Sequence, residues 1–180
     1  MKVTIKTIFV FAIFMLNGNS VFAVEQATLK TVKSKTVIVV RHAEKLSDGT
    51  RDPALSEKGT IRATALIKAL PKLSFSQAIA SNYQRTQLTL KPIAEANNIT
   101  ISIVGTADGL QDHITQVVEL VNGSDGNSII AGHSNTVPLI ISALGAPKIT
   151  ALKESDYGDL YRLTIKETGE MSLEKHHFGK

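Results

Sequence analysis

The sequence predicts an α/β protein with three layers, an α/β/α sandwich in which helices cover both faces of a mostly parallel central sheet. Short apolar runs rich in β-branched residues alternate along the chain with segments of helical periodicity. Such an alternation of strands and helices favours parallel pairing of the strands, with the helices packed on the sheet. No repeat, low-complexity tract or linker divides residues 36–180, so we expect a single domain there.

The first strand is predicted at residues 36–40 (TVIVV), which are β-branched and have polar residues on both sides. A helix is predicted to begin at Ser56 and to run to about Leu70, because serine caps helices and Pro71 ends the pattern. Its apolar residues are expected on one face: Ile61, Ala65, Leu66 and Leu70. A second strand is predicted at 76–81.

A second helix is predicted at 85–96, with an interruption near its middle at Pro92, because proline lacks a backbone N–H. Residues 101–104 alternate between apolar and polar side chains, which is typical of a third strand. A third helix is predicted at 112–121. Its apolar residues are expected on one side: Ile114, Val117, Val118 and Val121.

A fourth strand is predicted at 127–131, and a further helix at 135–144, which a glycine follows. The C-terminal part differs in character, because no helical pattern separates its two apolar runs. Residues 160–165 and 171–175 are therefore predicted to pair as strands around a turn at 167–169.

The first 23 residues are predicted to be a secretory signal peptide. Two early lysines precede an apolar run at 8–16, and small residues at 21 and 23 suit cleavage after Ala23. A retained anchor is the alternative, but crossing a bilayer takes about 20 apolar residues, more than this run supplies. We therefore expect residues 24–35 to form a polar leader and the mature protein to be periplasmic or secreted, without a stable membrane anchor.

The composition excludes several classes of function. The formal charge of +4 is not concentrated in any block, so no nucleic-acid partner is expected. The absence of cysteine excludes disulfides and thiolate chemistry. A hydrophobic fraction of 43% with 20% charged residues is that of a folded globular protein rather than a disordered one.

Residues suited to bind an anion follow three of the predicted strands. Arg41 and His42 follow the first strand, Arg85 lies shortly after the second, and His133 follows the fourth. In open α/β sheets, ligands bind beyond the carboxyl ends of the strands. We therefore expect these four side chains to converge on one site. Arg41 and His42 alone, or His133 alone, would be interpreted as ordinary loop residues.

This set of side chains suits the transfer of a phosphoryl group. Arg41 and Arg85 can each offer a planar fork of donors to the oxygens of a phosphate dianion. An imidazole has a pKa near 6.5, so it has an unprotonated nitrogen that can act as a nucleophile at neutral pH. The N-terminus of the helix after His133 is expected to add free backbone N–H groups. Because these groups supply the electrostatic stabilisation, no metal or other cofactor is expected.

The other histidines are expected to lie outside the site. His113 falls in the first turn of a helix and is expected on the surface. His176 and His177 are expected in an exposed C-terminal tail.

Four segments together resemble the histidine phosphatase superfamily, in the branch that includes cofactor-dependent phosphoglycerate mutase. Residues 41–45 (RHAEK) resemble its Arg-His-Gly signature, and residues 52–59 its Leu-Thr-x-x-Gly helix start. Residues 81–89 match its Ser-x-x-x-Arg-x-x-x-Thr pattern, and residues 132–138 its second-histidine motif. The motifs occur in the family's order over residues 36–165. The resemblance implies a phosphoglycerate mutase-like fold. It also implies that the predicted single domain, residues 36–180, is a catalytic domain of this family.

The resemblance also implies a role for each matching residue. His42 would take the phosphoryl group as a phosphohistidine, which water then hydrolyses. Three other side chains would hold the phosphoryl oxygens: Arg41, Arg85 and His133. Further substrate-binding residues are expected beside the two histidines: Glu44, Ser134 and Asn135.

Two positions depart from the family's pattern. Ala43 replaces the usual glycine, which costs little if its φ is negative. Asp48 stands where many members have a phosphate-binding asparagine, and its carboxylate would repel a phosphate. We therefore expect Asp48 not to contact the substrate.

The general acid that protonates the leaving oxygen is expected to be Asp112. The family usually supplies a carboxylate between the second arginine and the second histidine, where Asp108 and Glu119 are the other candidates. Asp112 could equally be a helix cap. Glu44, beside the nucleophile, is a further alternative.

These expectations favour a metal-independent phosphatase of the histidine acid phosphatase type, a hydrolase of phosphoric monoesters. Its substrate would be a small phosphorylated molecule or a phosphorylated component of the cell envelope. A mutase is less favoured, because the chain lacks long covering insertions and export would remove it from the glycolytic pool. A non-catalytic phosphate-binding module on the same fold is the other alternative, although binding alone does not need the nucleophile His42.

Overall fold

The computed structural model describes residues 33–179, which form four helices and six strands. The predicted signal peptide and most of the predicted leader lie outside the described residues. In chain order the elements are β1 (Lys35–Arg41), α1 (Glu57–Ala69), β2 (Gln77–Ser81), α2 (Gln84–Asn97), β3 (Ile101–Val104), α3 (Leu110–Gly123), β4 (Ser128–Gly132), α4 (Val137–Ala143), β5 (Asp159–Ile165) and β6 (Met171–His177). Within these residues no helix has both the length and the apolar content needed to cross a membrane.

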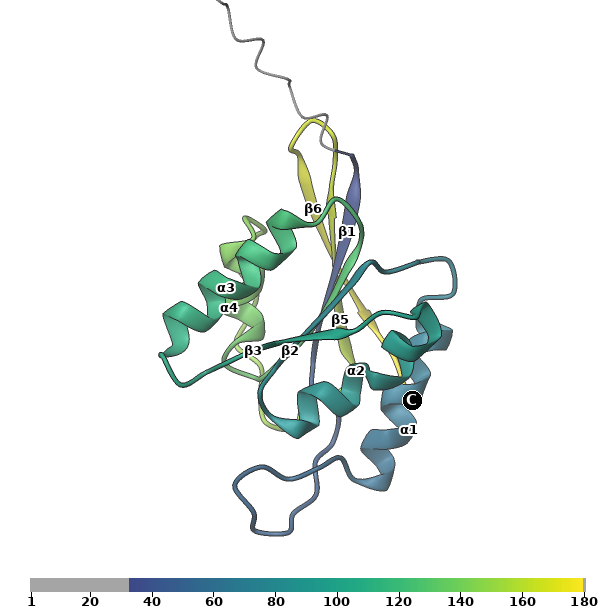
Figure 1. The fold of residues 1–180 in the computed structure, drawn as a ribbon, viewed down its shortest axis with the longest axis vertical. Helices are drawn as coiled ribbons and strands as arrows, with labels where there is room; N and C mark the ends of the chain where they lie inside the picture. The colour runs from purple at the N-terminus through teal and green to yellow at the C-terminus, as the bar shows by residue number, and fades with distance from the viewer. Residues whose placement is uncertain (1–32, 180) are drawn as a thin grey trace, which may run out of the picture. The chain divides into compact units, whose positions relative to one another are not determined.

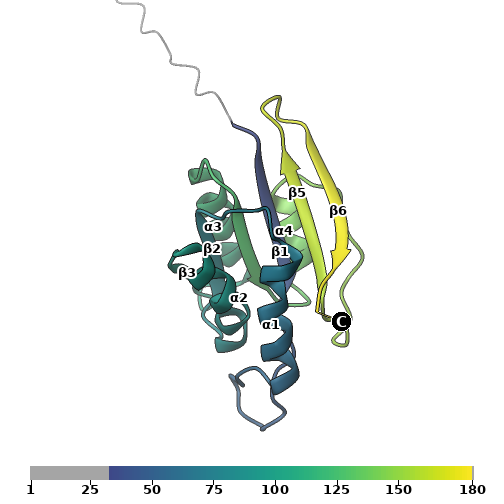
Figure 2. The same cartoon turned by 90° about the vertical axis from the view of Figure 1, so that its right-hand side faces the viewer.

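All six strands form one sheet in the order β3-β2-β4-β1-β5-β6. β4 pairs in parallel with both β1 and β2, and β2 also pairs in parallel with β3. β5 is antiparallel to β1 and to β6, so the two C-terminal strands extend one edge as a hairpin (Figure 2). The prediction of a mostly parallel sheet is confirmed. Because β4 lies between β1 and β2, the carboxyl ends of these two strands lie on either side of the carboxyl end of β4.

Alternate residues of the central strands enter two separate hydrophobic cores, because successive side chains of a strand point to opposite faces. Val37 and Val39 of β1 pack with α3 and α4. Ile38 and Val40, on the opposite face of the same strand, pack with α1 and α2. Figure 1 shows the two helix pairs on opposite sides of the sheet. The three-layer prediction is therefore confirmed.

Two details of the helices differ from the prediction. The predicted interruption at Pro92 is wrong, because α2 runs through it while Leu90 and Ile93 stay buried against the sheet. In α1, Ile61 is 66% exposed rather than part of the buried face. Leu66 and Leu70 are buried as predicted, but the buried face continues through Gly59, Arg62 and Ala63 rather than through Ile61.

The phase of α1 is set at its first turn. The Ser56 hydroxyl accepts a hydrogen bond from the N–H of Gly59 (3.2 Å), as the predicted cap requires. A Cβ at residue 59 would clash with the carbonyl oxygen of Glu44, so only glycine allows this close approach. The helix start is thereby packed against the segment that follows β1.

The C-terminal histidines are part of the sheet rather than a tail. His176 and His177 belong to β6 and pair with Leu160 and Asp159 of β5. Their side chains are exposed, as expected.

Candidate active site

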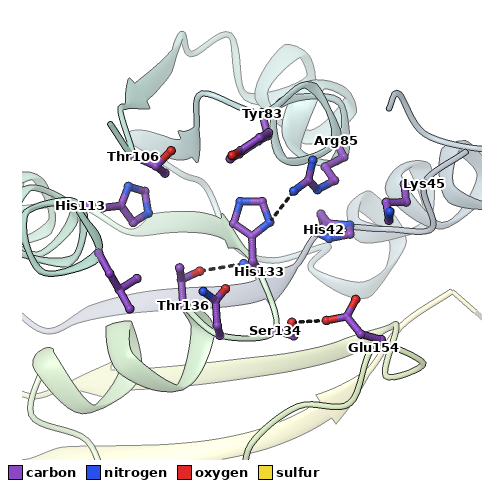
Figure 3. Close-up of a pocket in the computed structure, with 12 residues that line it drawn as sticks. His42, Lys45, Tyr83, Arg85, Thr106, His113, His133, Ser134, Thr136 and Glu154 are labelled. Atoms are coloured by element: carbon purple, nitrogen blue, oxygen red, sulfur yellow. Dashed lines mark hydrogen bonds between the residues drawn. The ribbon is translucent and has the colours of Figure 1, made fainter. Parts of the chain in front are cut away.

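A cavity of about 640 Å³ opens at the carboxyl ends of β1, β2 and β4 (Figure 3). Its lining combines three histidines with both kinds of charged side chain. The lining residues are His42, Lys45, Tyr83, Arg85, Thr106, Leu110, His113, His133, Ser134, Asn135, Thr136 and Glu154.

His42 directly follows β1, and its backbone N–H donates to the carbonyl oxygen of Gly132 (2.9 Å). The Nδ1 of its ring lies 2.8 Å from the carbonyl oxygen of Ala43. Because a carbonyl only accepts, Nδ1 carries the proton and Nε2 keeps its lone pair. Burial, followed by the charges of Arg41 and Arg85, lowers the pKa of His42 from 6.5 to about 4. The imidazole is therefore neutral at neutral pH.

The residue after His42 is held by α2. The N–H of Ala43 donates to the Thr89 hydroxyl (2.9 Å), which itself donates to the carbonyl oxygen of Arg85 (2.7 Å). Arg85 and Thr89 are one helical turn apart, so this contact gives a physical reason for the four-residue spacing of their motif. Ala43 has no positive φ, so its departure from glycine introduces no strain.

His133 lies next to His42, with the ring centroids 5.4 Å apart. Its Nδ1 is 3.5 Å from Nη2 of Arg85 and its Nε2 is 2.9 Å from the Ser81 hydroxyl. Because arginine only donates, Nδ1 is the acceptor and Nε2–H donates to Ser81. The Ser81 hydroxyl in turn reaches Thr86 (2.9 Å). Burial, and then the charge of His42, lowers the pKa of His133 to about 3.

Arg85 is the arginine that lines the cavity. It lies in the first turn of α2, and its guanidinium lies 4.3 Å from the centre of the Tyr83 ring. Its Nη1 is 3.6 Å from a carboxylate oxygen of Asp52, which also accepts from the N–H of Gln84 (3.0 Å). These contacts orient the guanidinium towards His133, as Figure 3 shows.

Arg41 does not line the cavity, contrary to the expectation that it holds phosphoryl oxygens. Its Nη1 donates to the carbonyl oxygens of Lys153 and Glu154 (2.7 Å each), and its Nη2 to the Glu154 carboxylate (2.8 Å). The guanidinium also stacks on the ring of Tyr157 at 4.5 Å. Arg41 therefore anchors the segment between α4 and β5, and only its Nε–H has no partner among the described residues.

Glu154, which no sequence motif indicated, is the carboxylate that lines the cavity. It accepts hydrogen bonds from Arg41 and from the Ser134 hydroxyl (2.5 Å). These contacts, with Ser134 the largest, hold the pKa of Glu154 below its usual value. The polar run at 153–156 just before β5 was the available signal, but only the folded chain shows which residue reaches the site.

None of the four predicted acids lines the cavity. Asp108 and Asp112 are exposed around the start of α3, and Glu119 lies two turns further along that helix. Glu44 forms two 2.8 Å hydrogen bonds with Arg62, which lower its pKa to about 2. The expected roles of Asp112 as the acid and of Glu44 as a substrate ligand do not fit these positions.

His113 is 2% exposed and lines the cavity, so the expectation of a surface residue is wrong. It packs on the same face of α3 as Ile114, Val117 and Val121. A signal was present in the sequence, because His113 precedes Val117 by four residues and so shares its apolar stripe.

Ser134 and Asn135 line the cavity where they were expected. The helix after them starts later than predicted, at Val137, and the N–H groups of Thr136 and Val137 already bond to the carbonyl oxygen of His133 (3.1 and 3.0 Å). These two groups are thus not free for an anion, whereas free N–H groups had been expected here. Asp48, which was not expected to contact substrate, accepts from Thr50 and does not line the cavity.

Comparison with known proteins identifies a family and solved structures that this chain resembles. Residues 37–110 match the model of the histidine phosphatase superfamily, branch 1. Among curated proteins, none matches the chain. The protein histidine phosphatase SixA, solved with tungstate, has a TM-score of 0.60 and 16% identity, covering 79% of this chain and 96% of that one.

Two further structures have comparable similarity. The mycobacterial glucosyl-3-phosphoglycerate phosphatase has a TM-score of 0.57 and 15% identity, covering 82% of this chain and 99% of that chain. The phosphoglycerate mutase from Bacillus anthracis has a TM-score of 0.58 and 14% identity, covering 81% and 94%. At these identities the likeness concerns the fold, and it confirms the phosphoglycerate mutase-like architecture.

Proposed function

We propose that this chain, which belongs to the histidine phosphatase superfamily, branch 1, hydrolyses phosphate monoesters through a phosphohistidine on His42. The observation that carries the proposal is the state of the His42 ring. The carbonyl oxygen of Ala43 fixes the proton on Nδ1, and the low pKa keeps the other nitrogen unprotonated. Nε2 is therefore a nucleophile at the cavity in which Arg85 and His133 can hold a dianion.

In the first step, the Nε2 lone pair attacks phosphorus and a P–N bond forms. The bond between phosphorus and the ester oxygen breaks, and the released oxygen keeps the electron pair and takes a proton from water. In the second step, water attacks the phosphohistidine, the P–N bond breaks and its electron pair returns to Nε2. The proton that this water releases neutralises the hydroxide left by the first step. The products are an alcohol and inorganic phosphate, and the enzyme is restored.

Arg85 and His133 would stabilise the charge of the transferring group. Arg85 supplies donors from a planar guanidinium, which match phosphoryl oxygens. A bound dianion would raise the pKa of His133, because a nearby opposite charge favours the imidazolium form. Nδ1 of His133 would then change from an acceptor for Arg85 to a donor to the phosphoryl group. Glu154 is ionised by its contacts with Ser134 and Arg41, so it is not the proton donor in this scheme.

The substrate that we propose is a small phosphate ester or a phosphorylated envelope component, met after export through the predicted signal peptide. The export can be tested by fractionating cells that make the full chain and sequencing the N-terminus of the mature product. A mature protein that begins at Val24 outside the cytoplasm is expected. An intact Met1 in the cytoplasm would overturn the export proposal without affecting the chemistry.

The activity is tested with p-nitrophenyl phosphate in the presence of EDTA. We expect turnover by the wild-type protein and a loss of at least about a thousandfold in His42→Asn, because the variant lacks the nitrogen that would carry the phosphoryl group. His176→Asn, an exposed histidine on β6, is the matched control and should retain full activity.

Brief exposure to a 32P-labelled ester should also label the wild-type protein with phosphate that is acid-labile and base-stable. His42→Asn should not be labelled. Undiminished turnover in His42→Asn would refute the mechanism. A wild-type protein that binds phosphate but turns over no ester would instead favour the non-catalytic module.

A further inference from the structure

The cavity extends past His133, on the side away from the nucleophile. Figure 3 shows the rings of His42 and His113 on opposite sides of His133. Thr106 lies beside His113, and Leu110 precedes His113 by one turn of α3. These three residues line the end of the cavity that the phosphoryl chemistry does not use.

The hydrogen-bonding state of His113 is determined by its neighbour. Its Nδ1 lies 3.0 Å from the carbonyl oxygen of Gly105, which can only accept, so Nδ1 carries the proton. In the neutral imidazole, Nε2 therefore presents a lone pair. Within residues 33–179 no group forms a hydrogen bond with this nitrogen, although the residue is only 2% exposed.

The same end of the cavity presents no charge. The charged lining residues are Lys45, Arg85 and Glu154, and Figure 3 shows all three towards His42. The Thr106 hydroxyl donates to the side-chain oxygen of Asn82 (3.0 Å), so its own oxygen remains able to accept. Thr106 and His113 thus offer two acceptors and no cation.

We propose that this end of the cavity binds the leaving group, and that His113 selects a neutral, hydroxyl-bearing leaving group by accepting a hydrogen bond at Nε2. The inference rests on the proposed phosphatase activity, because attack by His42 directs the leaving oxygen to the far side of the phosphoryl group. A polyol or sugar phosphate has the required donors. An acidic leaving group would find no cation among the residues that line this end of the cavity.

The test compares two esters with the same carbon chain, sn-glycerol 3-phosphate and n-propyl phosphate, of which only the first has hydroxyls. His113→Asn retains a side-chain N–H that can reach Gly105 but removes the acceptor at the Nε2 position. His113→Gln restores an amide oxygen near that position. Because the readout is the ratio of kcat/KM for two substrates of one variant, a general loss of activity or stability cancels.

We expect the wild-type enzyme to favour the glycerol ester by about five- to tenfold, the effect of one hydrogen bond. The ratio should fall to near one in His113→Asn, through the glycerol ester alone, and should be largely restored in His113→Gln. The same ratio in the wild type and in His113→Asn would overturn the role of His113, as would a wild-type ratio near one. A wild-type enzyme that hydrolyses neither these esters nor p-nitrophenyl phosphate would fail earlier, and both proposals would fall.

Discussion

Acidification should destabilise this protein at pH values well above those at which carboxylates titrate, because two histidines are buried in the neutral form. The pKa values of His42 and His133 are about 4 and about 3 in the folded state, against 6.5 for an ordinary histidine. Between these values and 6.5 the unfolded chain binds protons that the folded chain does not. The free energy of unfolding therefore falls as the pH is lowered from 7 towards 4.

The magnitude follows from the two shifts. At pH 5 each histidine should lower the free energy of unfolding by about 2 kcal/mol relative to pH 7.5, or about 4 kcal/mol together. Glu44, whose folded pKa is about 2, acts in the same direction but only as the pH falls through its ordinary value of 4.5. A comparison of pH 7.5 with pH 5 therefore isolates most of the histidine contribution.

The assay is urea denaturation of the full chain, followed by circular dichroism at pH 7.5 and pH 5. The double variant His42→Asn/His133→Asn should lose most of the pH dependence, whereas His176→Asn, with an exposed histidine, should keep it. An equally steep acid destabilisation in the double variant would refute the reasoning. Inorganic phosphate should reduce the loss in the wild-type protein, because a bound dianion favours the imidazolium form of His133.

Two further predictions concern side chains around the site. Arg62→Met should destabilise the protein by about 3 kcal/mol or more, since it leaves the largely buried Glu44 carboxylate without its main partner. In thermal unfolding, Lys58→Met is the matched control: Lys58 also contacts Glu44 (3.4 Å) but is 75% exposed, so its loss should cost below about 1 kcal/mol. Glu154→Gln should lower the inhibition constant of inorganic phosphate by about two- to fivefold, because it removes a negative charge beside the binding site. An unchanged or higher constant would show that the phosphate does not approach Glu154.

Much of this protein follows from local patterns. The run at 36–40 and the cap at Ser56 specify β1 and the start of α1 through neighbouring residues alone, so their positions were predicted closely. Arg85 and His133 could also be assigned to one site, since each follows a strand and parallel strands bring their carboxyl ends to the same edge of a sheet. Both line the cavity, as His42 does.

The direction in which particular side chains point could not be read in the same way. Arg41 occurs in the motif beside His42, yet its guanidinium is bound by carbonyl groups of the segment at 153–156, more than a hundred residues away. The carboxylate at the cavity is Glu154 rather than Asp112, because the α4–β5 connection returns over the site while Asp112 faces solvent.

The succession of strands and helices along the chain, and the segment that contains His42, could be predicted from sequence because both depend on residues that are near one another in the chain. The proton positions on His42, His133 and His113 follow only from the folded structure. Each of these was set by a carbonyl or side chain that the fold placed at one ring nitrogen. Such contacts require packed elements to be positioned to within a few tenths of an ångström, and no local sequence pattern encodes that positioning.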